Sequence, residues 1–173
     1  MSRDWSLRLA RPGDEDHMPE IEKAAATLFA DVPGLADLDP NDAWEEKELL
    51  RLIRKGHSLV THVGDRMVGF LASEPFSREL HIWELDVLPD FQGCGIGAGL
   101  VRAAQIDARS SGFNALTLTT FRDVPWNAPF YMRLGFEEVT ALDAHPRLAA
   151  LLVDEAQNGL PAERRCAMIC FLE

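Results

Sequence analysis

The sequence has few of the features that mark disulfide-stabilised, metal-binding or membrane proteins. It contains three cysteines in 173 residues and no C-x-x-C spacing, which excludes a disulfide framework and a cysteine zinc site. Its five histidines show no metal-ligand spacing, so we expect no metal site. No apolar run approaches the ~18 residues that span a membrane, and residues 1–9 lack the apolar segment of a signal peptide. We therefore expect a cytoplasmic protein with reduced thiols and no membrane contact.

Positive charge is scarce as well. The chain has 17 lysines and arginines against 28 aspartates and glutamates, which gives a net charge of −11. Such a surface repels nucleic acid and acidic membranes, so we expect neither as a partner, and it mildly favours a cationic substrate such as an amine. The length and the hydrophobic content of 47% are those of one ordinary globular domain, residues 1–173, with a core of its own.

The most informative stretch is residues 82–99, which changes from strand to loop to helix. Residues 82–88 are rich in strand formers, and Pro89, which lacks an N–H group, ends the strand. Four alternating glycines follow, before the apolar spacing becomes helical: Gly93, Gly95, Gly97 and Gly99. A glycine loop that opens a helix presents unpaired N–H groups at the positive end of the helix dipole. This stretch therefore predicts a phosphate or pyrophosphate site.

Three phosphate-binding motifs compete for this loop. A Walker loop needs Lys followed by Ser or Thr after the last glycine, and neither is present. Residues 93–98 satisfy the G-x-G-x-x-A fingerprint of dinucleotide-binding folds, but residues 116–121, about 20 positions further on, hold no acidic residue to bind a ribose. Residues 92–97 read Q-x-x-G-x-G, directly after a Val-x-Pro strand end, and this third pattern agrees with its flanks as well.

The third pattern resembles the coenzyme A pyrophosphate loop of the GNAT superfamily of N-acetyltransferases. A second segment, residues 130–136, reads F-Y-M-R-L-G-F and resembles the F-Y-x-x-L-G-F motif of the same family. The resemblance covers roughly residues 5–172. It implies an α/β (α+β) fold, with a mixed, mostly antiparallel central sheet and flanking helices.

Alternation, helical periodicity and turn residues predict elements in the order that this family shows. Strands are expected at residues 5–10, 58–63, 67–73, 82–88, 115–121, 136–140 and 165–172. Helices are expected at residues 14–30, at 42–55 with Asp42 as cap and Trp44 in its buried stripe, at 97–111, after Asn127, and at 145–157.

The resemblance also implies acetyl-CoA as cosubstrate and assigns residues to it. Loop residues would hold the pyrophosphate, mainly through backbone N–H groups, and the central strand would align the pantetheine arm through its backbone. The loop residues are Gln92, Gly93, Cys94, Gly95, Ile96, Gly97 and Ala98, and the strand residues are Leu85, Asp86 and Val87. The family often places an Asn six or seven residues before the F-Y tyrosine to contact the cofactor. Asn127 stands four residues before Tyr131, and capping a short helix explains it equally well.

Acetyl transfer also requires groups that accept and donate protons, because an alkylamine of pKa ~10.4 must lose a proton before it attacks. Glu84 is our candidate base, and Asp86, His81 or a water molecule are the alternatives. We expect Glu84 and Asp86 on one face of the strand, and His81 on the other face with Trp83. By resemblance, Tyr131 would protonate the leaving thiolate. Aromatic candidates for the acceptor pocket are Phe29, Trp44, Phe76 and Trp126.

The expected activity is direct acetyl transfer from acetyl-CoA to a primary amine in a ternary complex. The amine belongs to a small molecule or to a protein lysine or N-terminus. Within the same fold, the alternatives are transfer of another acyl group and a non-catalytic acyl-CoA-binding or regulatory domain; outside it, the alternative is a nucleotide-binding oxidoreductase. Because dimers are frequent in the family, the helix at 145–157 or the last strand could pack across a two-fold axis in a homodimer.

Overall fold

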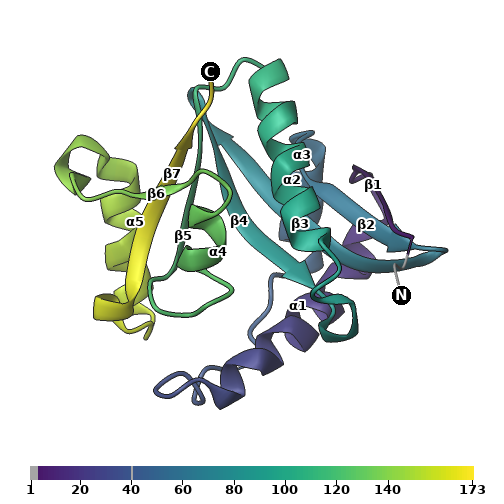
Figure 1. The fold of residues 1–173 in the computed structure, drawn as a ribbon, viewed down its shortest axis with the longest axis horizontal. Helices are drawn as coiled ribbons and strands as arrows, with labels where there is room; N and C mark the ends of the chain where they lie inside the picture. Colours follow the sequence, from purple (N-terminus) through teal and green to yellow (C-terminus); the bar gives the residue numbers. More distant parts are fainter. Residues whose placement is uncertain (1–3, 40) are drawn as a thin grey trace.

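The sheet of this protein has seven strands and is covered by helices on both faces (Figure 1). The structure is a computed structural model and describes residues 4–39 and 41–173. The strand order is β1-β2-β3-β4-β5-β7-β6, and every neighbouring pair is antiparallel except β4 and β5. The predicted mixed, mostly antiparallel sheet is thus confirmed. The strands are β1 (Ser6–Leu9), β2 (Leu59–Val63), β3 (Arg66–Phe76), β4 (Glu79–Val87), β5 (Ala115–Phe121), β6 (Glu137–Glu138) and β7 (Arg165–Phe171).

Two helical layers bury the two faces of the sheet. The helices are α1 (Met18–Ala26), α2 (Glu46–Arg54), α3 (Ile96–Ser110), α4 (Ala128–Met132) and α5 (Pro146–Gln157). Figure 1 shows α3 and α4 on one face, and α1, α2 and α5 on the other. Leu100 of α3 is fully buried with Leu71 on the first face, and Leu52 of α2 is fully buried with Phe70 on the second. None of the described helices is long and apolar enough to cross a membrane.

The first helix is shorter than the prediction of residues 14–30. It is divided into a 3-10 turn (Asp14–Asp16), α1 and a second 3-10 turn (Thr27–Asp31). Arg8 of β1 donates hydrogen bonds of 2.7 and 2.9 Å to Asp14, and the backbone N–H of Arg11 donates another of 2.8 Å. These bonds hold Asp14 in a turn of its own, so α1 begins only at Met18.

The second helix also begins later than predicted. α2 starts at Glu46 with Glu45 at its N-cap, so the prediction that Asp42 caps it was wrong. The backbone N–H of Trp44 donates a 3.0 Å hydrogen bond to the Glu22 carboxylate of α1. This bond holds Trp44 before the start of α2, so its ring is not part of the buried stripe of that helix.

β4 and β5 run parallel only near their first residues. Their pairing ends at His81 and Thr117, so the later part of β4 has a free edge toward β5. His81 is fully buried, and its Nδ1 atom lies 2.8 Å from the Thr117 hydroxyl, which ties the strands together where they separate. Figure 1 shows the two strands diverging from that end of the sheet. A ligand placed in the opening can therefore reach backbone groups in the middle of the sheet.

A β-bulge changes the faces that the side chains of β4 take. The register with β3 shifts by one residue at Trp83, which has no partner on the neighbouring strand. Trp83 points to the same side as Glu84: its ring centroid lies 5.6 Å from that of Trp44, whose indole donates a hydrogen bond to Glu84. The His81 ring lies only 4.4 Å from the Trp83 ring. The prediction that His81 and Trp83 face away from Glu84 and Asp86 was wrong, because strict alternation fails at a bulge.

Candidate active site

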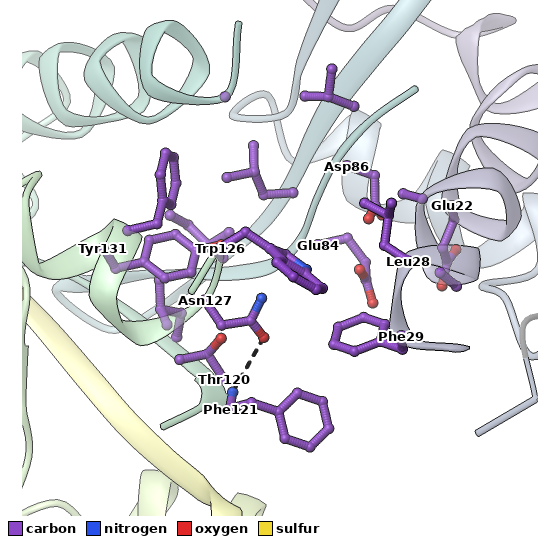
Figure 2. Close-up of a pocket in the computed structure, with 18 of the residues that line it drawn as sticks. Glu22, Leu28, Phe29, Glu84, Asp86, Thr120, Phe121, Trp126, Asn127 and Tyr131 are labelled. Carbon is purple, nitrogen blue, oxygen red and sulfur yellow. Dashed lines mark hydrogen bonds between the residues drawn. The ribbon is translucent and has the colours of Figure 1, made fainter. Parts of the chain in front are cut away.

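A cavity of about 720 Å³ lies where β4 and β5 separate. Its walls come from β4 and β5, the glycine loop before α3, the end of α1 and the start of α4. Figure 2 shows side chains from these segments around one space, with Glu84 beside Phe29 and Trp126. Of the residues predicted to bind the cofactor or to act as the base Glu84 and the acid Tyr131, all but Cys94 line this cavity: Glu84, Leu85, Asp86, Val87, Gln92, Gly93, Gly95, Ile96, Gly97, Ala98, Asn127 and Tyr131.

The glycine loop forms the end of the cavity at the start of α3. Gly93 and Gly95 have φ angles of +75° and +83°, which L side chains rarely adopt. Gly95 is the N-cap of α3, and the N–H groups of residues 96–98 have no acceptor within the described chain. The Gln92 amide donates a 3.2 Å hydrogen bond to the Val87 carbonyl, which ties the loop to the end of β4. The loop thus offers free N–H donors at the positive end of a helix, an arrangement that suits an anion.

Trp5, which the sequence analysis did not single out, packs behind this loop. A Cβ atom on Gly99 would lie 2.4 Å from Cη2 of the Trp5 ring, so only glycine allows α3 to approach the ring this closely. The Trp5 indole N–H donates a 3.2 Å hydrogen bond to the Cys94 carbonyl. Cys94 therefore helps to hold the loop in place, through its carbonyl group. No local pattern marks this contact, because its two residues are 89 positions apart.

Three carboxyl groups form another wall of the cavity. Glu84 and Asp86 project from β4, and Glu22, which the sequence analysis missed, projects from α1. Trp44 connects two of them, because its backbone N–H donates to Glu22 and its indole N–H donates a 3.2 Å hydrogen bond to Glu84. Oδ2 of Asp86 is buried and has no hydrogen-bond partner among the described residues. Figure 2 shows Glu22 and Asp86 on the same side of the cavity.

Burial and mutual repulsion raise the pKa values of all three carboxyl groups. Burial is the main cause at Glu22, and the charge of Glu84 adds to it, so the pKa rises to about 8. Burial and the charge of Glu22 raise the pKa of Asp86 to about 8. Burial and the charge of Asp86 raise the pKa of Glu84 well above its ordinary value. Carboxyl groups that exchange protons near neutral pH have the property that a general base needs.

Tyr131 faces the same cavity from α4. Its ring packs against Phe130 and Phe136, with centroid distances of 5.1 and 5.5 Å. Burial, together with the charges of Asp86 and Glu84, raises the pKa of its phenol. The hydroxyl therefore keeps its proton at neutral pH and can act as a donor.

Asn127 connects α4 to the end of β5. It occupies the N-cap position of α4, but its side chain makes no capping hydrogen bond. Its Oδ1 atom instead accepts a 3.4 Å hydrogen bond from the backbone N–H of Phe121. Side-chain capping was therefore the wrong interpretation, while a role in binding a cofactor stays a prediction.

His81 and Phe76 belong to a separate cluster beside α5. Nδ1 of His81 lies 3.1 Å from Nη1 of Arg147, whose guanidinium stacks 4.6 Å from the centroid of the Phe76 ring. Burial, and then the Arg147 charge, lower the pKa of His81 to about 3. An imidazole that is so difficult to protonate is a poor base, and neither residue is among those that line the cavity. Three of the four predicted pocket aromatics do line it: Phe29, Trp44 and Trp126.

The described residues contain no group of three or more His, Cys, Asp or Glu side chains that could hold a metal ion. The acetyltransferase (GNAT) family model matches residues 22–136, which contain the glycine loop, Glu84 and Asp86 of β4 and the F-Y motif. The chain belongs to the GNAT family. Members of this family are acetyltransferases. The matched region ends with the last residue of the F-Y-x-x-L-G-F segment, so it includes both of the motifs recognised in the sequence.

Solved structures of other GNAT proteins have the same fold at low sequence identity. The PaiA N-acetyltransferase from Thermoplasma acidophilum, in complex with coenzyme A, is 15% identical over 97% of this chain and 99% of that chain, with a TM-score of 0.73. The ribosomal-protein-S18-alanine N-acetyltransferase from Escherichia coli is 16% identical over 98% and 95%, with a TM-score of 0.69. A GNAT acetyltransferase from Brucella melitensis, in complex with acetyl-CoA, is 23% identical over 78% and 84%, with a TM-score of 0.59.

Proposed function

We propose that this GNAT protein is an N-acetyltransferase that transfers the acetyl group of acetyl-CoA directly to a primary amine in a ternary complex. The observation that carries the proposal is a single cavity that joins an anion-binding glycine loop to a buried carboxyl cluster. The coenzyme A and acetyl-CoA bound to two similar proteins support the choice of cosubstrate.

The chain offers each part of acetyl-CoA a suitable surface. The free N–H groups of the glycine loop would bind the pyrophosphate through charge-assisted hydrogen bonds. The free edge of β4 would bind the pantetheine amides through the backbone of residues 85–87, as an added strand would. This edge is open because β5 turns away after Thr117. Asn127 and Tyr131 line the cavity between these surfaces and would contact the cofactor there.

The carboxyl cluster would remove the proton of the acceptor. Moving a proton from an ammonium of pKa ~10.4 to an ordinary aspartate costs about 9 kcal/mol, at 1.36 kcal/mol per pKa unit. With a pKa of about 8, as at Asp86, the cost falls to about 3 kcal/mol. Burial and the charge of Asp86 raise the pKa of Glu84 as well, and Glu84 projects into the cavity (Figure 2). Glu84 is therefore our proposed base, directly or through a water molecule.

In the transfer step the amine nitrogen attacks the acetyl carbon, the new C–N bond forms and the C–S bond breaks. The ammonium first gives one proton to Glu84, and the neutral amine attacks. The leaving thiolate takes a proton from the Tyr131 hydroxyl, and the second nitrogen proton, lost as the amide forms, restores that hydroxyl, so that one proton remains on Glu84 and is released to solvent. Because its pKa is raised, Tyr131 holds this proton until the thiolate forms.

A thiol-release assay tests the proposal, with acetyl-CoA and a panel of polyamines, aminoglycosides, amino acids and lysine peptides, beside Tyr131→Phe. We expect turnover on one class of amine, and its loss in Tyr131→Phe with the Kd for acetyl-CoA unchanged. Binding of acetyl-CoA without turnover on any amine would favour an acyl-CoA-binding module. Failure to bind acetyl-CoA would overturn the proposal.

A further inference from the structure

The charges on the cavity wall are strongly unbalanced. Six carboxylate residues line the cavity: Glu22, Asp39, Asp42, Glu84, Asp86 and Glu155. Arg165 is the one lysine or arginine among the described lining residues, and it is already engaged, because it donates hydrogen bonds of 2.9 to 3.3 Å to both carboxylate oxygens of Glu155. None of the other five carboxylates forms an ion pair within the described chain.

Glu22 is buried and Glu84 and Asp86 are partly buried, and none of the three has an ion-pair partner among the described residues. Glu22 and Glu84 share the two N–H groups of Trp44, whereas the buried Oδ2 atom of Asp86 has no partner in the described chain. A buried carboxylate oxygen is costly unless a donor reaches it. The described residues hold no cluster suited to a metal ion, so an organic cation is the class of ligand that fits. An alkylammonium group brings three N–H donors and one positive charge.

Aromatic rings surround the carboxyl groups and complete the surface that such a cation would meet. Trp44 packs against Trp83 with a centroid distance of 5.6 Å, and Phe29 packs against Trp126 at 5.7 Å. All four rings line the cavity. The faces of aromatic rings attract ammonium groups, and the same rings provide apolar contact for a short methylene chain.

Resting on the proposed N-acetyltransferase activity, we propose that the acceptor is a short aliphatic diamine or polyamine. One amino group loses its proton to Glu84 and is acetylated, while a second remains an ammonium ion and binds Glu22 and Asp86. A monoamine would satisfy Glu84 alone. A protein lysine would bring one charge flanked by peptide groups and would leave Glu22 and Asp86 without a cation.

The matched pair butane-1,4-diamine and 4-aminobutan-1-ol tests this proposal, because the two differ in the second charge and hardly in length. We expect kcat/KM to be about 10- to 100-fold higher for the diamine, the range of a charge-assisted hydrogen bond. Glu22→Gln should remove most of this difference by lowering the diamine value more than that of the amino alcohol. Glu20→Gln, an exposed position on the same helix, is the matched control and should change neither. We would also measure kcat/KM for diamines of three to six carbons, so that the result does not depend on one chain length.

The outcomes distinguish failure of the diamine proposal from failure of the proposed N-acetyltransferase activity. Equal kcat/KM for the diamines and the amino alcohol, or a clear preference for lysine peptides, would overturn the diamine proposal and leave the N-acetyltransferase standing. If no amine is acetylated, calorimetric titration of butane-1,4-diamine into the protein with coenzyme A decides the matter. Binding that Glu22→Gln weakens would keep the diamine site while the proposed activity fails. Absence of binding would overturn the diamine site.

Discussion

The two ends of the cavity differ in charge. Residues 92–98 carry no charged side chain, and the loop acts through backbone N–H groups at the start of α3. The opposite end places Glu22, Glu84 and Asp86 together, without an ion-pair partner in the described chain. One end suits a polyanion and the other a cation. Charge alone can therefore orient two substrates so that their reactive groups meet in the middle, beside Tyr131.

The two ends also differ in what the free protein must tolerate. The N–H groups at the start of α3 line an open part of the cavity, where water can hydrogen-bond them. The carboxyl groups repel one another in a partly buried setting, and this repulsion is relieved by protons or by a bound cation. The loop is thus ready for its ligand in the free protein, whereas the carboxyl end changes its protonation when a ligand arrives. Four predictions test this difference.

The largest effect is expected at the carboxyl end. Glu84→Gln keeps an acceptor for the Trp44 indole but cannot take a proton, so kcat should fall by about 10²- to 10⁴-fold, the usual range for a general base. The Kd for acetyl-CoA, measured by calorimetry, should not change. Glu79→Gln is the control, because Glu79 lies on the same strand outside the cavity lining and pairs with Arg147. An equal fall in kcat in both variants would show that the substitutions disturb β4, and would contradict the role of Glu84 as the base.

The second prediction concerns pH. Glu22 and Asp86 have pKa values of about 8 in the folded protein, whereas the unfolded values are about 4. Between these limits the folded state binds more protons than the unfolded state. The two protonated carboxyl groups therefore stabilise the folded state most below about pH 4. This contribution to the free energy of unfolding is lost as the pH rises to and through about 8. At 1.36 kcal/mol per pKa unit each of the two groups costs about 5 kcal/mol over this window, so we expect the melting temperature of the free protein to fall by at least about 10 °C.

Glu22→Gln isolates the contribution of one carboxyl group to that fall. An amide stays neutral at every pH, so the melting temperature of the variant should depend less on pH between 5 and 8. Glu20→Gln, at an exposed position, should follow the wild-type curve. A wild-type melting temperature that rises through this window would contradict the raised pKa values.

The same two ends show what the sequence could and could not predict. The loop end was predictable because its residues are contiguous: the motif, the positive-φ glycines and the start of α3 follow one another within seven positions. β5 was predicted with its observed bounds. The carboxyl end was predicted only in part, since residues two apart on a strand share a face, which brought Glu84 and Asp86 together.

The remaining site residues depend on contacts between distant segments. Glu22 reaches the cavity because α1 packs across β4, and Trp44 does so because its N–H is bound by Glu22. Trp83 turned to the cavity side because of a bulge, a feature that depends on pairing with β3. Periodicity within one element carries no information about these contacts, so the sequence could not predict the residues of the carboxyl end beyond Glu84 and Asp86.

The third prediction tests the loop end. At Gly95, with φ of +83°, an alanine would pay about 1–2 kcal/mol for the left-handed conformation, although no atom lies within 4 Å of the added Cβ. The exposed loop can relieve this strain by changing its conformation. Binding of acetyl-CoA must then return the loop to the strained conformation, which costs binding free energy. We expect Gly95→Ala to weaken acetyl-CoA binding about tenfold, with KM for the amine unchanged. Gly112→Ala is the matched control, because Gly112 has φ of +85° and an equally open Cβ position at the other end of α3. Equal binding by both variants would show that the loop conformation does not matter.

The smallest effect is expected behind the loop. Trp5→Phe removes the 3.2 Å hydrogen bond to the Cys94 carbonyl and the distal indole atoms that lie against Gly99, while it keeps an aromatic ring at this position. A neutral hydrogen bond contributes about 0.5–1.5 kcal/mol, so KM for acetyl-CoA should rise about two- to tenfold while kcat at saturation stays the same. Leu7→Ala weakens the packing of β1, the strand that follows Trp5, and should lower the melting temperature without changing KM. If Leu7→Ala raises KM as much as Trp5→Phe does, the loop depends on the stability of β1 as a whole; a change confined to Trp5→Phe would show that one indole holds the anion-binding end of the cavity in place.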